Sequence, residues 1–214
     1  MVTLHCQAIL FDLDGTLVES TFFIESLWQD WGMQHGVAPQ RMSEVMHGRP
    51  AMEIINIVAP HLSTHEEIYA LETDEISHMD GMNVYPGALE LLKGLPAKQW
   101  AIVTSGSLRV ASARLNYGKL PTPNVFITAD DVKVGKPAPD AYLLAANHLH
   151  VEPVDCIVVE DAPAGIQAGK TAGMKVIGIA SSHSKEDLRQ ADVVVQQLAD
   201  MHVRVTNHEI EISF

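Results

Sequence analysis

Cysteine, lysine and long apolar runs are all scarce in this chain of 214 residues. Its two cysteines, Cys6 and Cys156, lack the C-x-x-C spacing, so we expect buried free thiols and no disulfide framework. The longest apolar runs are about five or six residues, far short of a membrane-spanning helix. No basic region leads into an apolar stretch near the first residue, so no signal peptide is predicted. These absences favour a cytoplasmic protein with no membrane partner.

Positive charge is also in short supply. The chain has 14 Lys and Arg against 27 Asp and Glu, a net charge of -13. Such a surface repels nucleic acid and anionic membranes, so we expect neither as a partner. Any anionic substrate must therefore be held by local cations.

Strand and helix patterns alternate through most of the chain. Its length suggests one main domain plus an insertion, by the prior of about 150 residues per domain. Continuous apolar runs predict strands at 8–11, 100–104, 125–128, 156–159, 176–179 and 193–195. Helical patterns lie between them at 88–95, 108–115, 138–148, 165–172 and 185–191. This alternation predicts an α/β fold with a doubly wound parallel sheet, which binds ligands at the carboxyl ends of its strands.

Residues 18–83 differ from the rest because they show helix-period patterns and no convincing buried strand. We predict that they form an inserted helical domain, and that residues 1–17 and 84–214 form the core. Between residues 18 and 82 there are eleven acidic residues and two basic ones, Arg41 and Arg49. The tail "VRVTNHEIEISF" alternates around Asn207-His208, which predicts a β-hairpin at the edge of the sheet.

Two predicted strands end on paired acids. Asp12 and Asp14 follow the first apolar run, and Glu160 and Asp161 follow the run at 156–159. Paired like charges at a buried strand end are unfavourable unless a cation lies between them. Neighbouring strand ends lie about 5 Å apart, so both pairs can converge on one ion. Carboxylate and phosphate oxygens are the ligands that Mg²⁺ prefers, so we expect this ion here. The structural alternative is that Asp14 caps the N-terminus of a helix.

Two further polar elements follow later strands. Ser105 and Gly106 come just before a predicted helix, where a hydroxyl and a backbone amide can bind a phosphate oxygen. Taken alone, this pair is more typical of an ordinary serine helix cap, by about three to one. Lys136 stands between Gly135 and Pro137, and its ammonium group could neutralise a phosphoryl group or the acidic cluster. Taken alone, such a lysine is more typical of a solvated surface charge.

Together these elements resemble the four motifs of the haloacid dehalogenase superfamily of phosphotransferases, and they occur in its order over essentially the whole chain. The inserted helices resemble the cap domain that this family carries between its first two motifs. The stretches "TSGS", "GKPAPDAY" and "VVEDAPAGIQAGKTAG" are similar to its small sugar and polyol phosphatases. Glu19 stands where many relatives have Asp, which bears on cap hinging and not on the chemistry.

The resemblance implies a role for each motif. Asp12 would be the nucleophile that forms an aspartyl-phosphate, and Asp14 the general acid and base. Ser105, the Gly106 amide and Lys136 would hold the phosphate oxygens. Mg²⁺ would be bound by the Asp12 carboxylate, the Asp14 backbone carbonyl and Asp161, with Glu160 binding directly or through water.

The substrate implied is a small phosphorylated sugar or polyol. In the cap we single out His47, Gly48 and Arg49 as candidate substrate-binding residues, because the family's specificity loop falls near them. Arg109 could reach the substrate if it faces the cleft. We expect the chain to act as a monomer.

Other activities of the superfamily are less well matched. A β-phosphoglucomutase uses a cap histidine and a cap lysine, but the matching histidine position is Ile24 and no lysine precedes Lys93. The missing lysine also disfavours a phosphonate hydrolase, and a dehalogenase does not require Asp14. A receiver-type regulatory domain phosphorylated on aspartate shares the acidic cluster, but it would lack the large insertion.

Overall fold

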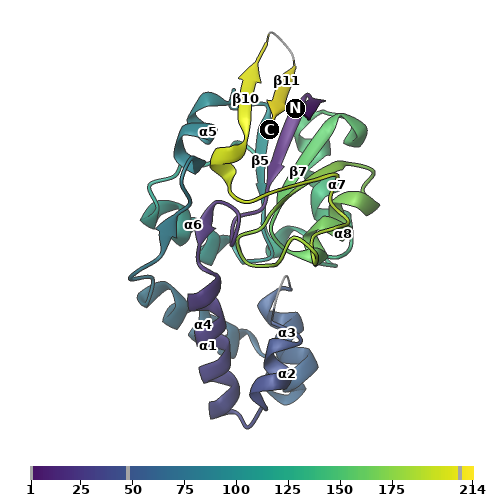
Figure 1. The fold of residues 1–214 in the computed structure, drawn as a ribbon. Helices are drawn as coiled ribbons and strands as arrows, with labels where there is room; N and C mark the ends of the chain where they lie inside the picture. The colour runs from purple at the N-terminus through teal and green to yellow at the C-terminus, as the bar shows by residue number, and fades with distance from the viewer. Residues whose placement is uncertain (1, 47–48, 207–208) are drawn as a thin grey trace.

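The core of the protein is a six-stranded parallel sheet (Figure 1), seen in a computed structural model that describes residues 2–46, 49–206 and 209–214. The strand order is β6-β5-β2-β7-β8-β9, with every neighbouring pair parallel. These strands are β2 (Ala8–Phe11), β5 (Trp100–Val103), β6 (Phe126–Ile127), β7 (Cys156–Glu160), β8 (Lys175–Ile179) and β9 (Val193–Val195). The predicted strands and the doubly wound parallel sheet are therefore confirmed.

Helices cover both faces of this sheet. They are α5 (Ala88–Gly94), α6 (Leu108–Tyr117), α7 (Asp140–Leu149) and α8 (Pro163–Thr171). Alternate residues of β2 point to opposite faces: Ile9 and Phe11 join a cluster with residues of α5 and α6, whereas Ala8 and Leu10 join one with residues of α7 and α8. Burial on both faces explains why the strands are continuously apolar.

The predicted helix at 185–191 is wrong, because residues 185–190 form turns. The Ser184 side chain exchanges hydrogen bonds with Asp187, and the backbone N–H of Ala191 reaches back only to the carbonyl of Leu188. Leu188 is the one fully buried side chain of the segment. A segment this short, with one apolar anchor, gains too little packing to sustain a helix.

The inserted segment forms the expected helical cap. Its helices are α1 (Thr21–Gln34), α2 (Pro39–Ser43), α3 (Ala51–Val58) and α4 (His65–Ser77), and they enclose a separate apolar cluster that includes Trp28, Trp31 and Ile55. Figure 1 shows them beyond the loops that follow the strands. Two short strands, β3 (Val18–Glu19) and β4 (Asn83–Val84), pair antiparallel where the chain enters and leaves the cap.

The tail forms the predicted hairpin from β10 (His202–Val205) and β11 (Ile210–Ser213), although the predicted turn residues Asn207 and His208 lie outside the described residues. Its predicted place at the edge of the main sheet is wrong. β11 pairs with β1 (Thr3–Cys6), giving a separate sheet of order β1-β11-β10. Ile210 and Ile212 are buried against the main core. Single 3₁₀ turns occur at Pro60–Leu62, Ala129–Asp131, Pro153–Asp155 and Leu198–Asp200.

Both cysteines are free and buried, as predicted. Burial raises the pKa of each thiol to about 12, so neither carries reactive thiolate near neutral pH. None of the helices in the described ranges combines the length and the apolar character that a membrane crossing requires.

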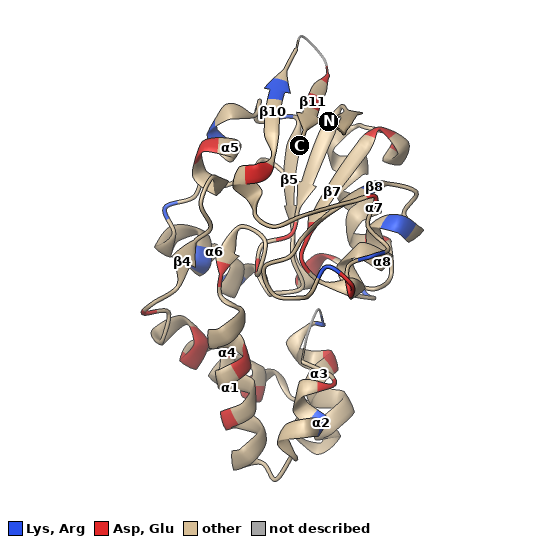
Figure 2. Ribbon diagram, viewed as in Figure 1, with Lys and Arg blue, Asp and Glu red and all other residues tan. Residues whose placement is uncertain are grey.

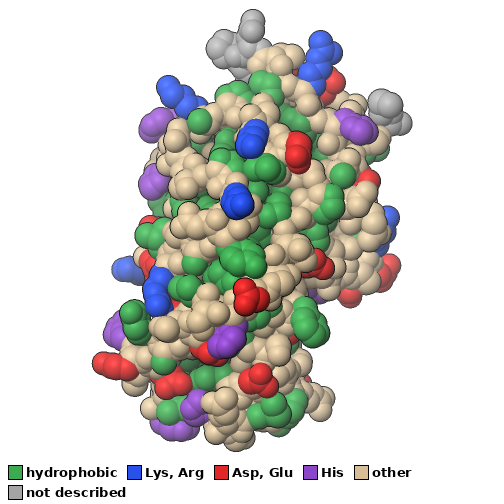
Figure 3. Space-filling view, turned by 90° about the vertical axis from the view of Figure 1, so that its left-hand side faces the viewer, with side chains coloured by type: hydrophobic (Ala, Val, Ile, Leu, Met, Phe, Trp, Pro, Cys, Tyr) green, Lys and Arg blue, Asp and Glu red, His purple; other side chains and the backbone are tan. Residues whose placement is uncertain are grey.

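Acidic residues dominate the cap. Figure 2 shows them spread over α1, α3 and α4, and the only basic residues of residues 18–83 are Arg41 and Arg49. On the side of the molecule seen in Figure 3, acidic and histidine side chains lie over both the cap and the core, whereas Lys and Arg lie mostly over the core. Because the cap is acidic, the positive charge that binds an anionic ligand must come from a few individual Lys or Arg side chains.

Candidate active site

The predicted site residues meet at one edge of the main sheet. β2 pairs with β5 on one side and β7 on the other, with Phe11 opposite both Ile102 and Val159. Asp12, Thr104 and Glu160 therefore leave three neighbouring strands at the same level. This is the convergence of strand ends that the sequence predicted.

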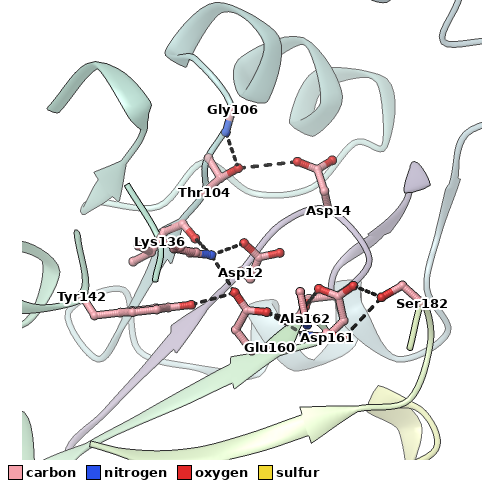
Figure 4. Close-up of polar contacts among 12 residues, drawn as sticks. Asp12, Asp14, Thr104, Gly106, Lys136, Tyr142, Glu160, Asp161, Ala162 and Ser182 are labelled. Atoms are coloured by element: carbon pink, nitrogen blue, oxygen red, sulfur yellow. Dashed lines mark hydrogen bonds and ion pairs between the residues drawn. The ribbon is translucent and has the colours of Figure 1, made fainter. Parts of the chain in front are cut away.

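Lys136 lies at the centre of this edge and is buried (Figure 4). Its Nζ donates to Asp12 Oδ1 at 2.5 Å, to Glu160 Oε1 at 2.7 Å and to the carbonyl oxygen of Val103 at 3.1 Å. All three ammonium hydrogens thus have acceptors. Asp12 and Glu160 raise the pKa of Lys136 well above its usual value, although burial acts in the opposite direction.

Glu160 is fixed from several directions. Its Oε1 also accepts from the Tyr142 hydroxyl at 3.2 Å, and its Oε2 accepts from the backbone N–H groups of Asp161 and Ala162 at 2.9 Å each. A Cβ at Gly165 would collide with the Glu160 carboxylate, so only glycine lets α8 pack this closely. The carboxylate of Glu160 therefore stays at the wall of the site with both oxygens occupied.

Asp161 is held by two hydroxyls. Thr16 Oγ1 donates to its Oδ1 at 3.3 Å, and the Ser182 hydroxyl donates to its Oδ2. Gly15, whose φ is +83°, passes so near that a Cβ there would collide with the Asp161 carboxylate. Glycine is needed at this position both for the left-handed backbone conformation and for the close approach.

Asp12, Glu160 and Asp161 form a cluster that could hold a cation. Each residue offers one oxygen, and these oxygens all lie within 4.8 Å of one another in a buried setting. Burial and, to a smaller extent, the neighbouring charge of Glu160 together raise the pKa of Asp161 to about 7. Burial likewise raises the pKa of Asp12 well above its usual value, although Lys136 opposes that shift. Lys136 balances only one of the three formal negative charges, so an all-oxygen set with this charge fits a divalent cation.

Asp14 points away from this cluster, and its side chain binds other partners. Ser20 Oγ donates to its Oδ1 at 2.5 Å, and Arg114 donates to its Oδ2 at 2.6 Å. Thr104 Oγ1 lies 3.5 Å from the same Oδ2. Because the Ser20 hydroxyl is used here, it makes no capping hydrogen bond to α1. The predicted role of Asp14 as a metal ligand through its backbone carbonyl stays a prediction.

Arg114 is a site residue that the sequence reasoning missed. It is buried on α6 and also donates to Glu75 of the cap helix α4. The signal was present in the sequence, because Arg114 occupies the apolar face of its helix together with Val110, Ala111 and Leu115. A charged residue on that face indicates a buried partner of opposite charge.

A cavity of about 310 Å³ opens from this edge toward the cap. Ser105, Gly106 and Lys136 line it from the core, and Ser107 caps α6 by accepting from the Val110 N–H. The N–H of Gly106 donates to Thr104 Oγ1 at 3.0 Å. The cavity lies where the motifs predicted a phosphate site.

The cap residues singled out from the sequence have different outcomes. Arg49 lines the cavity, but its Nε lies 3.2 Å from Glu53 Oε1 and one of its η-nitrogens donates to the carbonyl oxygen of Val45. His47 and Gly48 lie outside the described residues. Arg109 is not among the residues that line the cavity, and its guanidinium instead lies over the Tyr69 ring and contacts Glu72 of α4.

Comparison with known proteins identifies the family. The haloacid dehalogenase-like hydrolase family matches residues 6–173. Hexitol phosphatase A of Escherichia coli is 41% identical over 94% of this chain and 95% of its own. The 2-deoxyglucose-6-phosphate phosphatase 2 of Saccharomyces cerevisiae is 39% identical over 94% of this chain and 91% of its own. The crystal structure of a hydrolase from Pseudomonas syringae matches with a TM-score of 0.74 and 26% identity over 89% of this chain and 93% of that one.

The chain therefore belongs to the haloacid dehalogenase-like hydrolase family. The resemblance noted in the sequence and the fold that it implied are confirmed, including the cap inserted between the first two motifs.

Proposed function

We propose that this protein is a Mg²⁺-dependent phosphatase that hydrolyses small sugar or polyol phosphates through an aspartyl-phosphate on Asp12. The observation that carries the proposal is the buried cluster of Asp12, Lys136, Glu160 and Asp161, which opens into a cavity enclosed by the cap. The two phosphatases named above support the substrate class, because both are similar to this chain over nearly their whole length.

The donor set fits a magnesium ion. The carboxylates of Asp12 and Asp161 would bind it with the backbone carbonyl of Asp14, and Glu160, whose oxygens already have donors, would act through water. When bound, the ion would supply positive charge that offsets the repulsion between the Asp12 carboxylate and the phosphate.

The residues of the chain then divide the work. An Asp12 oxygen attacks phosphorus, and the bond to the leaving sugar oxygen breaks as Asp14 gives that oxygen a proton. Water then attacks the same phosphorus and gives a proton to Asp14, and the bond to Asp12 breaks to release phosphate. Ser105, the Gly106 N–H and Lys136 would orient the phosphoryl oxygens. For this the Gly106 N–H exchanges Thr104 Oγ1, and Lys136 one of its three acceptors, for a phosphate oxygen.

We propose residues 18–83 as the cap domain and residues 1–17 and 84–214 as the core; the cap would exclude water from the site and select the leaving group. Arg49 supports the role in selection, because it lines the cavity and is one of two cations in that segment. His47 and Gly48 are proposed as substrate-binding residues beside it. We also propose that the protein acts as a monomer. Two buried free cysteines fit the reducing cytoplasm.

The first test is phosphate release from hexose, deoxyhexose, hexitol, pentose and glycerol phosphates and phosphoglycolate, with and without EDTA. We expect release that favours sugar or polyol phosphates, is lost with EDTA and returns with Mg²⁺, because the phosphate and Asp12 would otherwise repel each other. No release from any ester by folded, Mg²⁺-loaded protein would contradict the proposal. It would favour a phosphosugar mutase or a regulatory role, even though Ile24 lines the cavity at the mutase histidine position.

Magnesium binding should strengthen as the pH rises. Asp161 has a pKa of about 7 in the metal-free protein, so its proton competes with the cation below that pH and not above it. We expect the affinity for Mg²⁺ to rise about tenfold between pH 6 and pH 8. Isothermal titration calorimetry at these pH values would measure it, with two buffers of different ionisation enthalpy to count the protons released. An affinity that does not change with pH would show that Asp161 is not a ligand.

A further inference from the structure

Arg114 links the core to the cap through a single buried guanidinium group. One of its η-nitrogens donates to Asp14 Oδ2 at 2.6 Å, and the other donates to Glu75 on α4. The Arg114 side chain is only 4% exposed, whereas that of Asp14 is 19% exposed. The Arg114 side chain is thus almost fully buried, whereas the Asp14 carboxylate that it contacts is still partly exposed to the cavity.

The contacts of Asp14 leave it little freedom to turn. Ser20 occupies one oxygen and Arg114 the other, so the plane of the carboxylate is set by donors from two separate elements. The fork of Arg114 is itself fixed at its far side by Glu75. Because the guanidinium is planar and rigid, holding one of its nitrogens at Glu75 fixes where the other meets Asp14.

We propose that Arg114 is a positioning residue that holds the Asp14 carboxylate for the second half of the reaction. In that step Asp14 accepts a proton from the water that attacks the aspartyl-phosphate, and the bond between phosphorus and Asp12 breaks. The inference rests on the proposed function, and it concerns a residue outside the four motifs.

The same helix supplies a matched control. Arg109 on α6 also reaches α4, where it contacts Glu72, Thr73 and the Tyr69 ring, but it makes no contact with Asp14. Replacing Arg109 therefore removes contacts between core and cap alone. Replacing Arg114 removes a contact between core and cap together with the hydrogen bond to Asp14.

The experiment uses p-nitrophenyl phosphate with Mg²⁺, because a nitrophenolate leaves without needing a proton. For Arg114→Met we expect kcat to fall about tenfold to hundredfold, since the aspartyl-phosphate is hydrolysed slowly. KM should fall with it, so that kcat/KM stays within about threefold of the wild type. A burst of nitrophenolate close to one equivalent of enzyme should appear in rapid mixing. Arg114→Lys should recover part of kcat, and Arg109→Met should show neither the fall nor the burst.

Several outcomes would overturn the inference. A parallel loss of kcat and kcat/KM without a burst would mean that Arg114 supports the site as a whole. The same kinetic pattern in Arg109→Met would mean that tying the cap is sufficient, and an unchanged kcat in Arg114→Met would mean that Asp14 needs no such hold. If Arg114→Met does not fold, Arg114→Met combined with Glu75→Gln removes the carboxylate left unpaired in the cap and is measured in the same way. Wild-type protein that releases no nitrophenolate would overturn the proposed function as well.

Discussion

Asp12→Asn will abolish phosphate release while the protein stays folded. The substitution keeps the shape of the side chain but removes the oxygen nucleophile, and loss of a nucleophile typically costs about 10⁴-fold or more in kcat. Stability should hold, because Asp12 is one of three acids in a buried cluster and burial already raises its pKa well above the usual value. Removing one carboxylate leaves Lys136 paired with Glu160.

The measurements are phosphate release with the best ester of the panel and the free energy of unfolding in urea. We expect the latter to stay within about 1 kcal/mol of the wild type or to increase. Asp14→Asn is the matched control, because it changes a neighbouring acid and should cost a smaller factor of about 10² to 10⁴. Substantial activity in Asp12→Asn protein, shown by mass to be free of deamidated chain, would remove the nucleophile assignment.

Lys136→Met will destabilise the fold and inactivate the site. Lys136 is the cation that contacts both Asp12 and Glu160, and its side chain is 3% exposed. Removing one partner of such a buried ion pair costs about 3–5 kcal/mol, because the remaining charges are left uncompensated. Activity should fall with it, since only the proposed Mg²⁺ then offsets the repulsion between the carboxylates and an incoming phosphate.

The pH dependence of this loss has a definite sign. In the wild type, the charge of Lys136 lowers the pKa of Asp12. Removing Lys136 therefore raises the pKa of Asp12 in the folded state further. Folded protein would then bind protons that the unfolded chain has released, so the loss should shrink at pH 5 and grow toward pH 8. Urea unfolding at both pH values measures this. Lys170→Met is the control: its pair with Asp192 is at the surface, with Lys170 38% exposed, and should contribute at most about 1 kcal/mol. Equal effects of the two substitutions would contradict the central role of Lys136.

Most of the core could be predicted from local pattern. The runs at 8–11 and 193–195 became strands with the predicted bounds, because a strand buried on both faces needs an unbroken apolar run. The convergence of Asp12 and Glu160 followed from the same reasoning, since parallel neighbours bring their carboxyl ends to one edge. The helix prediction at 185–191 was wrong because the periodicity of that segment does not indicate how little apolar surface it buries.

Local sequence determined the parallel sheet, the inserted helices and the acids, lysine and hydroxyl at its edge, since each follows from the spacing of residues within one short stretch. Only the tertiary structure decided which charges pair. It brought β1 beside β11, placed Arg109 against the cap instead of the cavity, and joined Asp14 to Glu75 through Arg114. These contacts join residues as many as 210 positions apart, as Thr3 and Ser213 are. A buried charge takes whichever partner the packing of distant elements leaves within reach, and that choice is not encoded in any one stretch of the chain.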